Sequence, residues 1–92
     1  LMPEFGFGQG QWSCLDRLWV GESGWKWNAE NPSSGAYGIP QSLPARKMAT
    51  MGKDYRTNPV TQIRWGLDYI KKAYGTPCNA LSQWNSRSPH WY

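Results

Sequence analysis

Residues 59–74 constrain the fold most, because helix signals stand at both ends of this segment. Asn58 is a favoured N-cap residue, and Pro59 suits the first helical position. Gly75, followed by Pro77, is a stop signal. Apolar side chains recur between these ends with helical spacing: Ile63, Leu67, Ile70 and Tyr74. The sequence therefore predicts an amphipathic helix over residues 59–74 whose apolar stripe meets the core.

A second helix is predicted over Trp12–Ser23, and it carries a carboxylate on its apolar side. Apolar residues recur there at spacings of three and four: Leu15, Leu18 and Trp19. Glu22 continues this register, so its side chain is predicted to point inward. Gly24 is a stop signal, which leaves Glu22 in the last turn, where the helix dipole disfavours an anion by roughly 0.3 to 1 kcal/mol. Both placements are expected to raise the pKa of Glu22.

Gly66 lies in the middle of the 59–74 helix, where a glycine costs about 1 kcal/mol relative to alanine. We expect this glycine to let another helix approach closely, and the Trp12–Ser23 helix is the candidate. The long helix would then lie beside the helix that carries Glu22.

Residues 25–41 contain prolines and glycines among small polar residues, and this punctuation excludes a long helix. Short extended pieces are predicted around residues 36–39, which gives a looped lobe beside the helix that carries Glu22. Short helices are predicted over residues 44–51 and 78–83.

The two cysteines, Cys14 and Cys78, offer a covalent brace. A chain of 92 residues allows one domain with one modest core, so such a brace is expected. A disulfide would close a loop of about 65 residues, contribute roughly 4 kcal/mol in the chain-entropy model and imply an oxidising compartment. The alternative is two buried free thiols, and the spacing matches no zinc or Cys-x-x-Cys pattern.

The predicted domain organisation is simple. Residues 1–11 contain three glycines and one proline without a helical period, so we expect a flexible N-terminal arm there and one folded domain over residues 12–92. Residues 85–92 are too short to form a further domain. No apolar run of about 18 residues predicts a membrane span, and no signal peptide is recognisable, so export is inferred from the cysteines.

The net charge of +4 is spread along the chain, and a diffuse positive field favours an anionic polymer as partner. Seven Trp and five Tyr exceed what a small core needs, and their flat rings suit stacking on sugars or bases. Cell-wall glycan and nucleic acid both fit these features, but no nucleic-acid recognition motif is present.

Several catalytic classes find little support. His90 is the single histidine and no Gly-x-Ser-x-Gly elbow occurs, which disfavours a Ser/His/Asp hydrolase. The six carboxylates show no metal-ligand spacing, so neither metal nor other cofactor is expected. An inward carboxylate beside a looped, aromatic lobe suits proton donation to a glycosidic oxygen. The alternative is a hydrogen-bonded core glutamate without a catalytic role.

Three motifs resemble the signature of the lysozyme-fold lytic transglycosylases of the soluble (SLT) type. They are Glu22-Ser23, the stretch Gly-Ala-Tyr-Gly-Ile-Pro-Gln-Ser-Leu-Pro over residues 35–44, and Tyr69-Ile70. The second motif is most similar to a compact variety found in secreted wall enzymes of Gram-positive bacteria and in phage tail proteins. Pro40 stands where that family usually has Met, and the late Tyr-Asn-Ala-Gly motif is absent.

The resemblance implies a mainly α, small lysozyme-like (α+β) domain, with a few helices around a catalytic helix and a short Gly/Pro-rich loop or β lobe. It implies that Glu22 is the single acid/base that cleaves the MurNAc–GlcNAc β-1,4 bond of peptidoglycan and leaves 1,6-anhydroMurNAc ends. Ser23 and Gly66 would support Glu22. The implied substrate-binding residues are Tyr37, Ile39, Pro40, Gln41 and Tyr69.

Rival functions stay open at this point. A lysozyme-type hydrolase would need a second carboxylate, and Glu30 and Asp54 lie in loops that could reach the groove. A wall-binding module without turnover is a second alternative, and a nucleic-acid-binding domain a third. For the enzyme we expect that glycan strands, rather than nucleic acid, are the partner and that the protein is a monomer. We expect it to act outside the cell, in the cell wall or in a phage tail.

Overall fold

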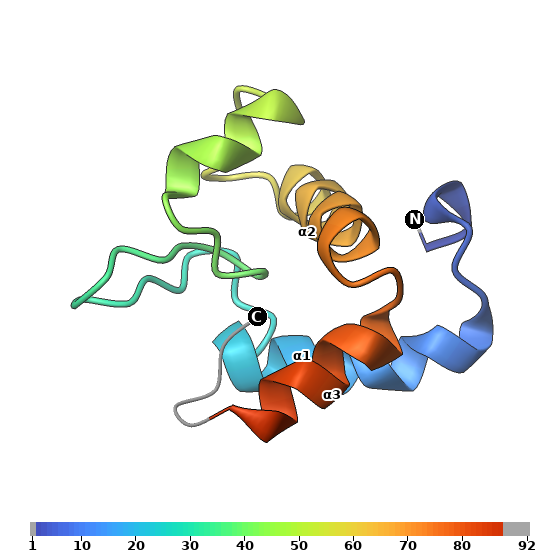
Figure 1. Cartoon of the computed structure of the whole chain (residues 1–92). Coiled ribbons are helices and arrows are strands. Elements are labelled where there is room, and N and C mark those ends of the chain that lie inside the picture. The colour runs from blue at the N-terminus through green and yellow to red at the C-terminus, as the bar shows by residue number, and fades with distance from the viewer. Residues whose placement is uncertain (1, 88–92) are drawn as a thin grey trace.

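The computed structural model of the chain describes residues 2–87, so residues 88–92, including His90, lie outside the described part. Three α-helices form its frame: α1 (Trp12–Ser23), α2 (Pro59–Ala73) and α3 (Pro77–Ser86). Three short 3-10 helices accompany them: η1 (Met2–Phe5), η2 (Gln9–Gln11) and η3 (Ala45–Thr50). The predicted mainly helical fold is confirmed (Figure 1). No helix within residues 2–87 is long and apolar enough to cross a membrane.

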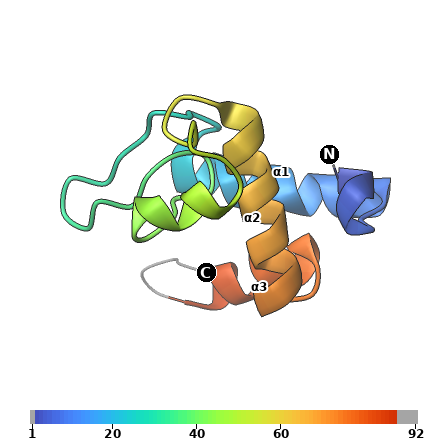
Figure 2. The ribbon, with the colours of Figure 1, turned by 90° about the horizontal axis from the view of Figure 1, so that it is seen from above.

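The lobe of residues 25–57 lies at one end of α1, and the N-terminal residues lie at the other (Figures 1 and 2). The predicted extended pieces of the lobe are two isolated antiparallel bridges, Glu30 with Tyr37 and Tyr37 with Ser42. The predicted helix over residues 44–51 is present as the 3-10 helix η3. The lobe is thus held mostly by turns, as its prolines and glycines predict.

Helix α1 begins and ends at the predicted residues. Gly24 adopts the left-handed conformation (φ 63°), and its N–H donates to the carbonyls of Trp19 and Val20. This cap ends the helix at Ser23. The predicted apolar stripe of α1 is buried: Leu15, Leu18 and Trp19.

Helix α2 also follows its sequence signals. The side chain of Asn58 accepts a hydrogen bond from the N–H of Val60, and Pro59 occupies the first turn. Leu67 and Ile70 of the predicted stripe are fully buried, and Ile63 and Tyr74 pack against the same core. The helix ends at Ala73, one residue earlier than predicted, with Tyr74 as its C-cap.

Gly66 does permit a close approach by the predicted helix α1, and the group of α1 that makes the approach is the side chain of Trp19. A Cβ atom at Gly66 would lie 2.5 Å from Cζ2 of Trp19 and 3.0 Å from Cβ of Pro40. The indole of Trp19 therefore lies against the backbone of α2 and fills the space between α1 and α2. The helix that packs most extensively on α1 is α3.

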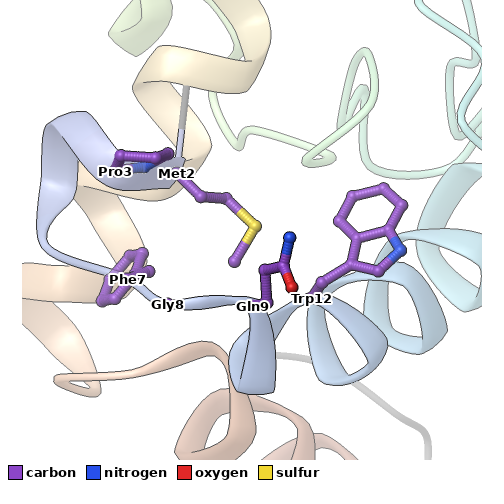
Figure 3. A pocket seen from close by; sticks show the side chains of 6 residues that line it. All are labelled: Met2, Pro3, Phe7, Gly8, Gln9 and Trp12. Carbon is purple, nitrogen blue, oxygen red and sulfur yellow. The ribbon is translucent and has the colours of Figure 1, made fainter.

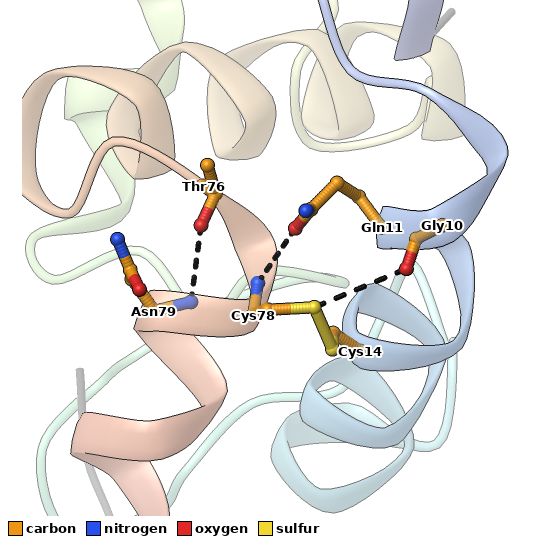
Figure 4. Close-up of a disulfide and its surroundings, with 6 residues drawn as sticks. All are labelled: Gly10, Gln11, Cys14, Thr76, Cys78 and Asn79. Carbon is orange, nitrogen blue, oxygen red and sulfur yellow. Dashed lines mark hydrogen bonds between the residues drawn. A yellow bond between two sulfur atoms is a disulfide. The ribbon is translucent and has the colours of Figure 1, made fainter.

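A disulfide between Cys14 and Cys78 joins α1 to the first turn of α3, with an S–S distance of 2.08 Å (Figure 4). The predicted brace is confirmed. The N–H of Cys78 also donates to Oε1 of Gln11 at 3.0 Å. Helix α3 begins one residue before and ends three residues after the predicted 78–83, and Thr76 caps its start by accepting from the N–H of Asn79.

Residues 2–11 do not form the loose arm that their glycines predict. Phe7 is buried in the main core, and Met2 and Phe5 pack against that core. Glu4 forms an ion pair with Arg64 of α2 at 3.5 Å. These apolar anchors outweigh the glycines, and they leave an apolar groove of about 600 Å³ beside the start of α1 (Figure 3).

The lobe is tied to α2 by Gln62, whose side chain is fully buried. Its Nε2 donates to the carbonyls of Trp27 at 2.9 Å and Tyr55 at 2.8 Å. Its Oε1 accepts from the N–H of Ile39 at 2.9 Å. One amide thus joins three separate segments of the lobe, including the segment that carries the predicted substrate-binding residues.

Replacing Gln62 with Met keeps the length of the side chain but removes all three hydrogen bonds. The free energy of unfolding, measured by urea denaturation, is expected to fall by about 1 to 3 kcal/mol, because buried partners lose their hydrogen bonds. Gln83→Met is the matched control, since Gln83 is exposed on α3. Equal stabilities of the two variants would contradict the role of Gln62.

Candidate active site

Glu22 lies in the last turn of α1, in a groove of about 440 Å³. The end of α1, over residues 20–24, forms one wall of this groove, and loop residues that include Lys26, Glu30 and Gln41 form the other. The Glu22 side chain is half-buried rather than enclosed in the core. Because the helix stops directly after it, the carboxylate is held by the fold and still reaches the groove.

Trp84 of α3 contacts the carboxylate of Glu22 directly. Its indole Nε1–H donates to Oε1 of Glu22 at 2.8 Å. The same ring covers Gly21, where a Cβ atom would lie 2.5 Å from Cη2 of Trp84. Sequence patterns did not single out Trp84 among seven tryptophans, or Gly21 among ten glycines.

Ser23 joins the end of α1 to the lobe. Its Oγ donates to the carbonyl of Ile39 at 2.8 Å. Ile39 is 2% exposed, and its N–H is bonded to Gln62, so both of its backbone polar groups have partners within the protein. Ile39 therefore positions the loop. It is not among the residues that line the groove of Glu22, and its role in substrate binding stays a prediction.

Gln41 is shared by the groove of Glu22 and a second, smaller pocket. It lines the groove of Glu22 and also a smaller pocket of about 90 Å³ that contains Pro40, Lys47 and Tyr69. Gln41 has a positive φ of 54°, and its Nε2 donates to the carbonyls of Gly38 and Ala29. These bonds hold a strained residue in place between the groove and the smaller pocket.

The side chain of Tyr37 is buried within the lobe. Its hydroxyl donates to the carbonyl of Arg56 at 2.8 Å, and its ring packs with Ala45 and Met48 in a second small core. Tyr37 is not among the residues that line the groove of Glu22 or the pocket of Tyr69, and its role in substrate binding stays a prediction.

Tyr69 presents an aromatic wall to the smaller pocket. Its ring stacks on that of Trp65, with centroids 5.2 Å apart and an interplanar angle of 6°. Burial raises the pKa of the Tyr69 hydroxyl above its ordinary value of 10.0, and the nearby Tyr74 and Glu22 raise it further. The hydroxyl therefore stays protonated at neutral pH and can donate a hydrogen bond.

The remaining carboxylates differ in their access to Glu22. Glu30 lines the same groove. Asp54 instead accepts from Asn58 Nδ2 and Thr61 Oγ1, both at 2.8 Å, and these bonds hold the pKa of its carboxyl below the usual 3.8. Asp54 is thus part of the start of α2 and does not line the groove.

Comparison with known proteins gives one match. A family model described as the transglycosylase SLT domain matches residues 9–87, which include Glu22, the lobe and all of α2 and α3. No curated protein and no solved structure matches the chain. The family match agrees with the mainly helical structure. The chain therefore belongs to the family of transglycosylase SLT domains.

Proposed function

We propose that the chain is a lytic transglycosylase that cleaves the MurNAc–GlcNAc β-1,4 bond of peptidoglycan with Glu22 as its single acid/base. The observation that carries the proposal is the position of Glu22, which lines an open groove and is held by an indole N–H. Membership of the SLT family supports peptidoglycan as the substrate.

In the proposed reaction Glu22 first acts as an acid. It protonates the glycosidic oxygen while the bond between that oxygen and C1 of the muramyl residue breaks through an oxocarbenium-like state. The C6 hydroxyl of the same muramyl residue then attacks C1 and gives its proton to the Glu22 carboxylate. This step closes the 1,6-anhydro ring, returns the proton to Glu22 and consumes no water.

The glycan strand would run along the groove and into the smaller pocket. There the paired rings of Trp65 and Tyr69 offer a flat wall for a sugar, and Gln41 and Pro40 lie opposite. Lys47 lines this pocket, and within residues 2–87 no ion pair involves it. Its ammonium group suits the carboxylates of muramyl residues and peptide stems.

The second candidate is a hydrolase of the same bond, and the position of Glu30 in the groove is the observation that favours it. A hydrolase places its second carboxylate about 5 to 9.5 Å from the acid, so that it can attack or activate water. Asp54 is a poorer candidate, since both of its carboxylate oxygens are bonded at the start of α2.

The product separates the two reactions. Mass spectrometry of digested peptidoglycan is expected to show 1,6-anhydromuramyl ends, lighter by one water than the reducing ends that a hydrolase leaves. Glu30→Gln is expected to leave this product and the rate nearly unchanged. Reducing muramyl ends, together with loss of activity in Glu30→Gln, would establish a hydrolase instead.

The proposed setting follows from the substrate. Peptidoglycan lies outside the cytoplasmic membrane, and a disulfide persists in an oxidising environment. We therefore place the protein outside the cell, in the cell wall or in a phage tail, and we propose that it acts as a monomer without a cofactor.

A further inference from the structure

Helix α3 is fixed to α1 at two separate points. The disulfide at Cys78 lies in its first turn, and Trp84 lies six residues later, about 9 Å along the helix axis. The indole of Trp84 fits against α1 only because residue 21 is glycine, since a Cβ atom there would lie 2.5 Å from Cη2 and 2.6 Å from Cζ2 of the ring. This packing places the indole N–H at the Glu22 carboxylate.

The chemistry of the indole group makes this contact directional. An indole N–H can donate a hydrogen bond but cannot accept one. In the neutral acid the carbonyl oxygen is a better acceptor than the hydroxyl oxygen, so the hydrogen bond from Trp84 to Oε1 favours the form with its proton on Oε2. The neutral acid therefore carries its proton mainly on Oε2.

We propose that Trp84 is a positioning residue that assigns the transferable proton of Glu22 to Oε2. The proposal rests on the proposed role of Glu22 as acid. A carboxylic acid that is free to rotate presents its proton on either oxygen, and it would meet the glycosidic oxygen with the wrong one for part of the time. Trp84 disfavours that alternative and also restrains the carboxylate.

Other charged or titratable groups also face Glu22 and act on it from the groove side. Lys26 and Glu30 of the lobe line the groove with Glu22. Tyr69 of α2 is close enough to Glu22 for the carboxylate to raise the pKa of the Tyr69 hydroxyl. Trp84 approaches from α3, so its contribution can be removed without changing any of these groups.

The hydrogen bond can be tested by NMR without any assay of activity. The indole N–H signal of Trp84 is identified as the one that disappears in Trp84→Phe. It is expected to lie downfield, to shift with pH as Glu22 titrates, and to lose this shift in Glu22→Gln. Trp25 is the matched control, because its indole N–H donates to Asp16 at 2.9 Å, and its signal should not respond to Glu22→Gln. A Trp84 signal that is the same in Glu22→Gln as in the wild type would overturn the proposal.

The functional consequence is tested by kinetics on soluble glycan fragments. Trp84→Phe keeps an aromatic ring over Gly21 but removes the N–H, so kcat is expected to fall about tenfold to a hundredfold while KM changes less than about threefold. Trp25→Phe, which loses an equivalent indole–carboxylate bond elsewhere, is expected to keep the wild-type kcat. An increase in KM at constant kcat would show a substrate contact and overturn the positioning role. A wild-type protein that binds the glycan without cleaving it would overturn the proposed function, and the NMR result would still decide whether Trp84 holds Glu22.

Discussion

Replacing Glu22 with glutamine is expected to lower the rate of peptidoglycan cleavage by at least about a hundredfold, which is the usual contribution of a general acid or base. Glutamine keeps the shape of the side chain, and its carbonyl oxygen can still accept the hydrogen bond from Trp84. It cannot supply or recover a proton. The melting temperature should therefore stay close to that of the wild type while turnover is lost.

Glu30→Gln is the matched control for this variant, because it makes the same chemical change in the same groove. Its rate is expected to stay within about twofold of the wild type if one carboxylate performs both proton transfers. The rates are measured by release of soluble fragments from purified cell wall. A Glu22→Gln protein that retains half of the wild-type rate would contradict the assignment of the acid.

The helices could be predicted because their signals are local. The N-cap at Asn58, the left-handed Gly24 and the register of the apolar residues all act within one or two turns. Thr76 is a signal of the same kind that was missed, and it accounts for the start of α3 one residue before the predicted Cys78. The prediction of a loose arm over residues 2–11 was wrong for a different reason. The glycines of this segment do not indicate that Phe7 packs in the core.

The candidate site could be predicted only in part, for a related reason. The spacing of the apolar residues places Glu22 on one face of α1. The contact between Glu22 and Trp84, however, joins residues that are 62 positions apart and depends on the packing of α3. Gln62 holds the lobe through contacts as distant as 35 residues. Tyr37 and Ile39 belong to the same motif as Gln41, which lines the groove, and a motif does not tell which of its side chains face the substrate and which hold the loop.

The second large effect concerns the disulfide between Cys14 and Cys78. Their separation of 64 residues means that the bond removes much of the chain's freedom in the unfolded state, which contributes roughly 4 kcal/mol in the chain-entropy model. For a domain of this size, each kcal/mol corresponds to about 4 to 8 °C in Tm. Even half of this free energy, about 2 kcal/mol, corresponds to a decrease of about 10 °C in Tm. We therefore expect reductant to lower the Tm by about that amount.

The double variant Cys14→Ser/Cys78→Ser provides the control, since reductant should leave its Tm unchanged near that of the reduced wild type. Because the disulfide also fixes α3 along α1, its loss is expected to loosen the contact between Trp84 and Glu22, and activity should fall well below the temperature at which the protein unfolds. Calorimetry and the cleavage assay, run with and without reductant, measure both effects. An unchanged Tm in the reduced wild type would contradict the bracing role, and an unchanged rate at low temperature would show that the packing of α3 alone keeps Trp84 in place.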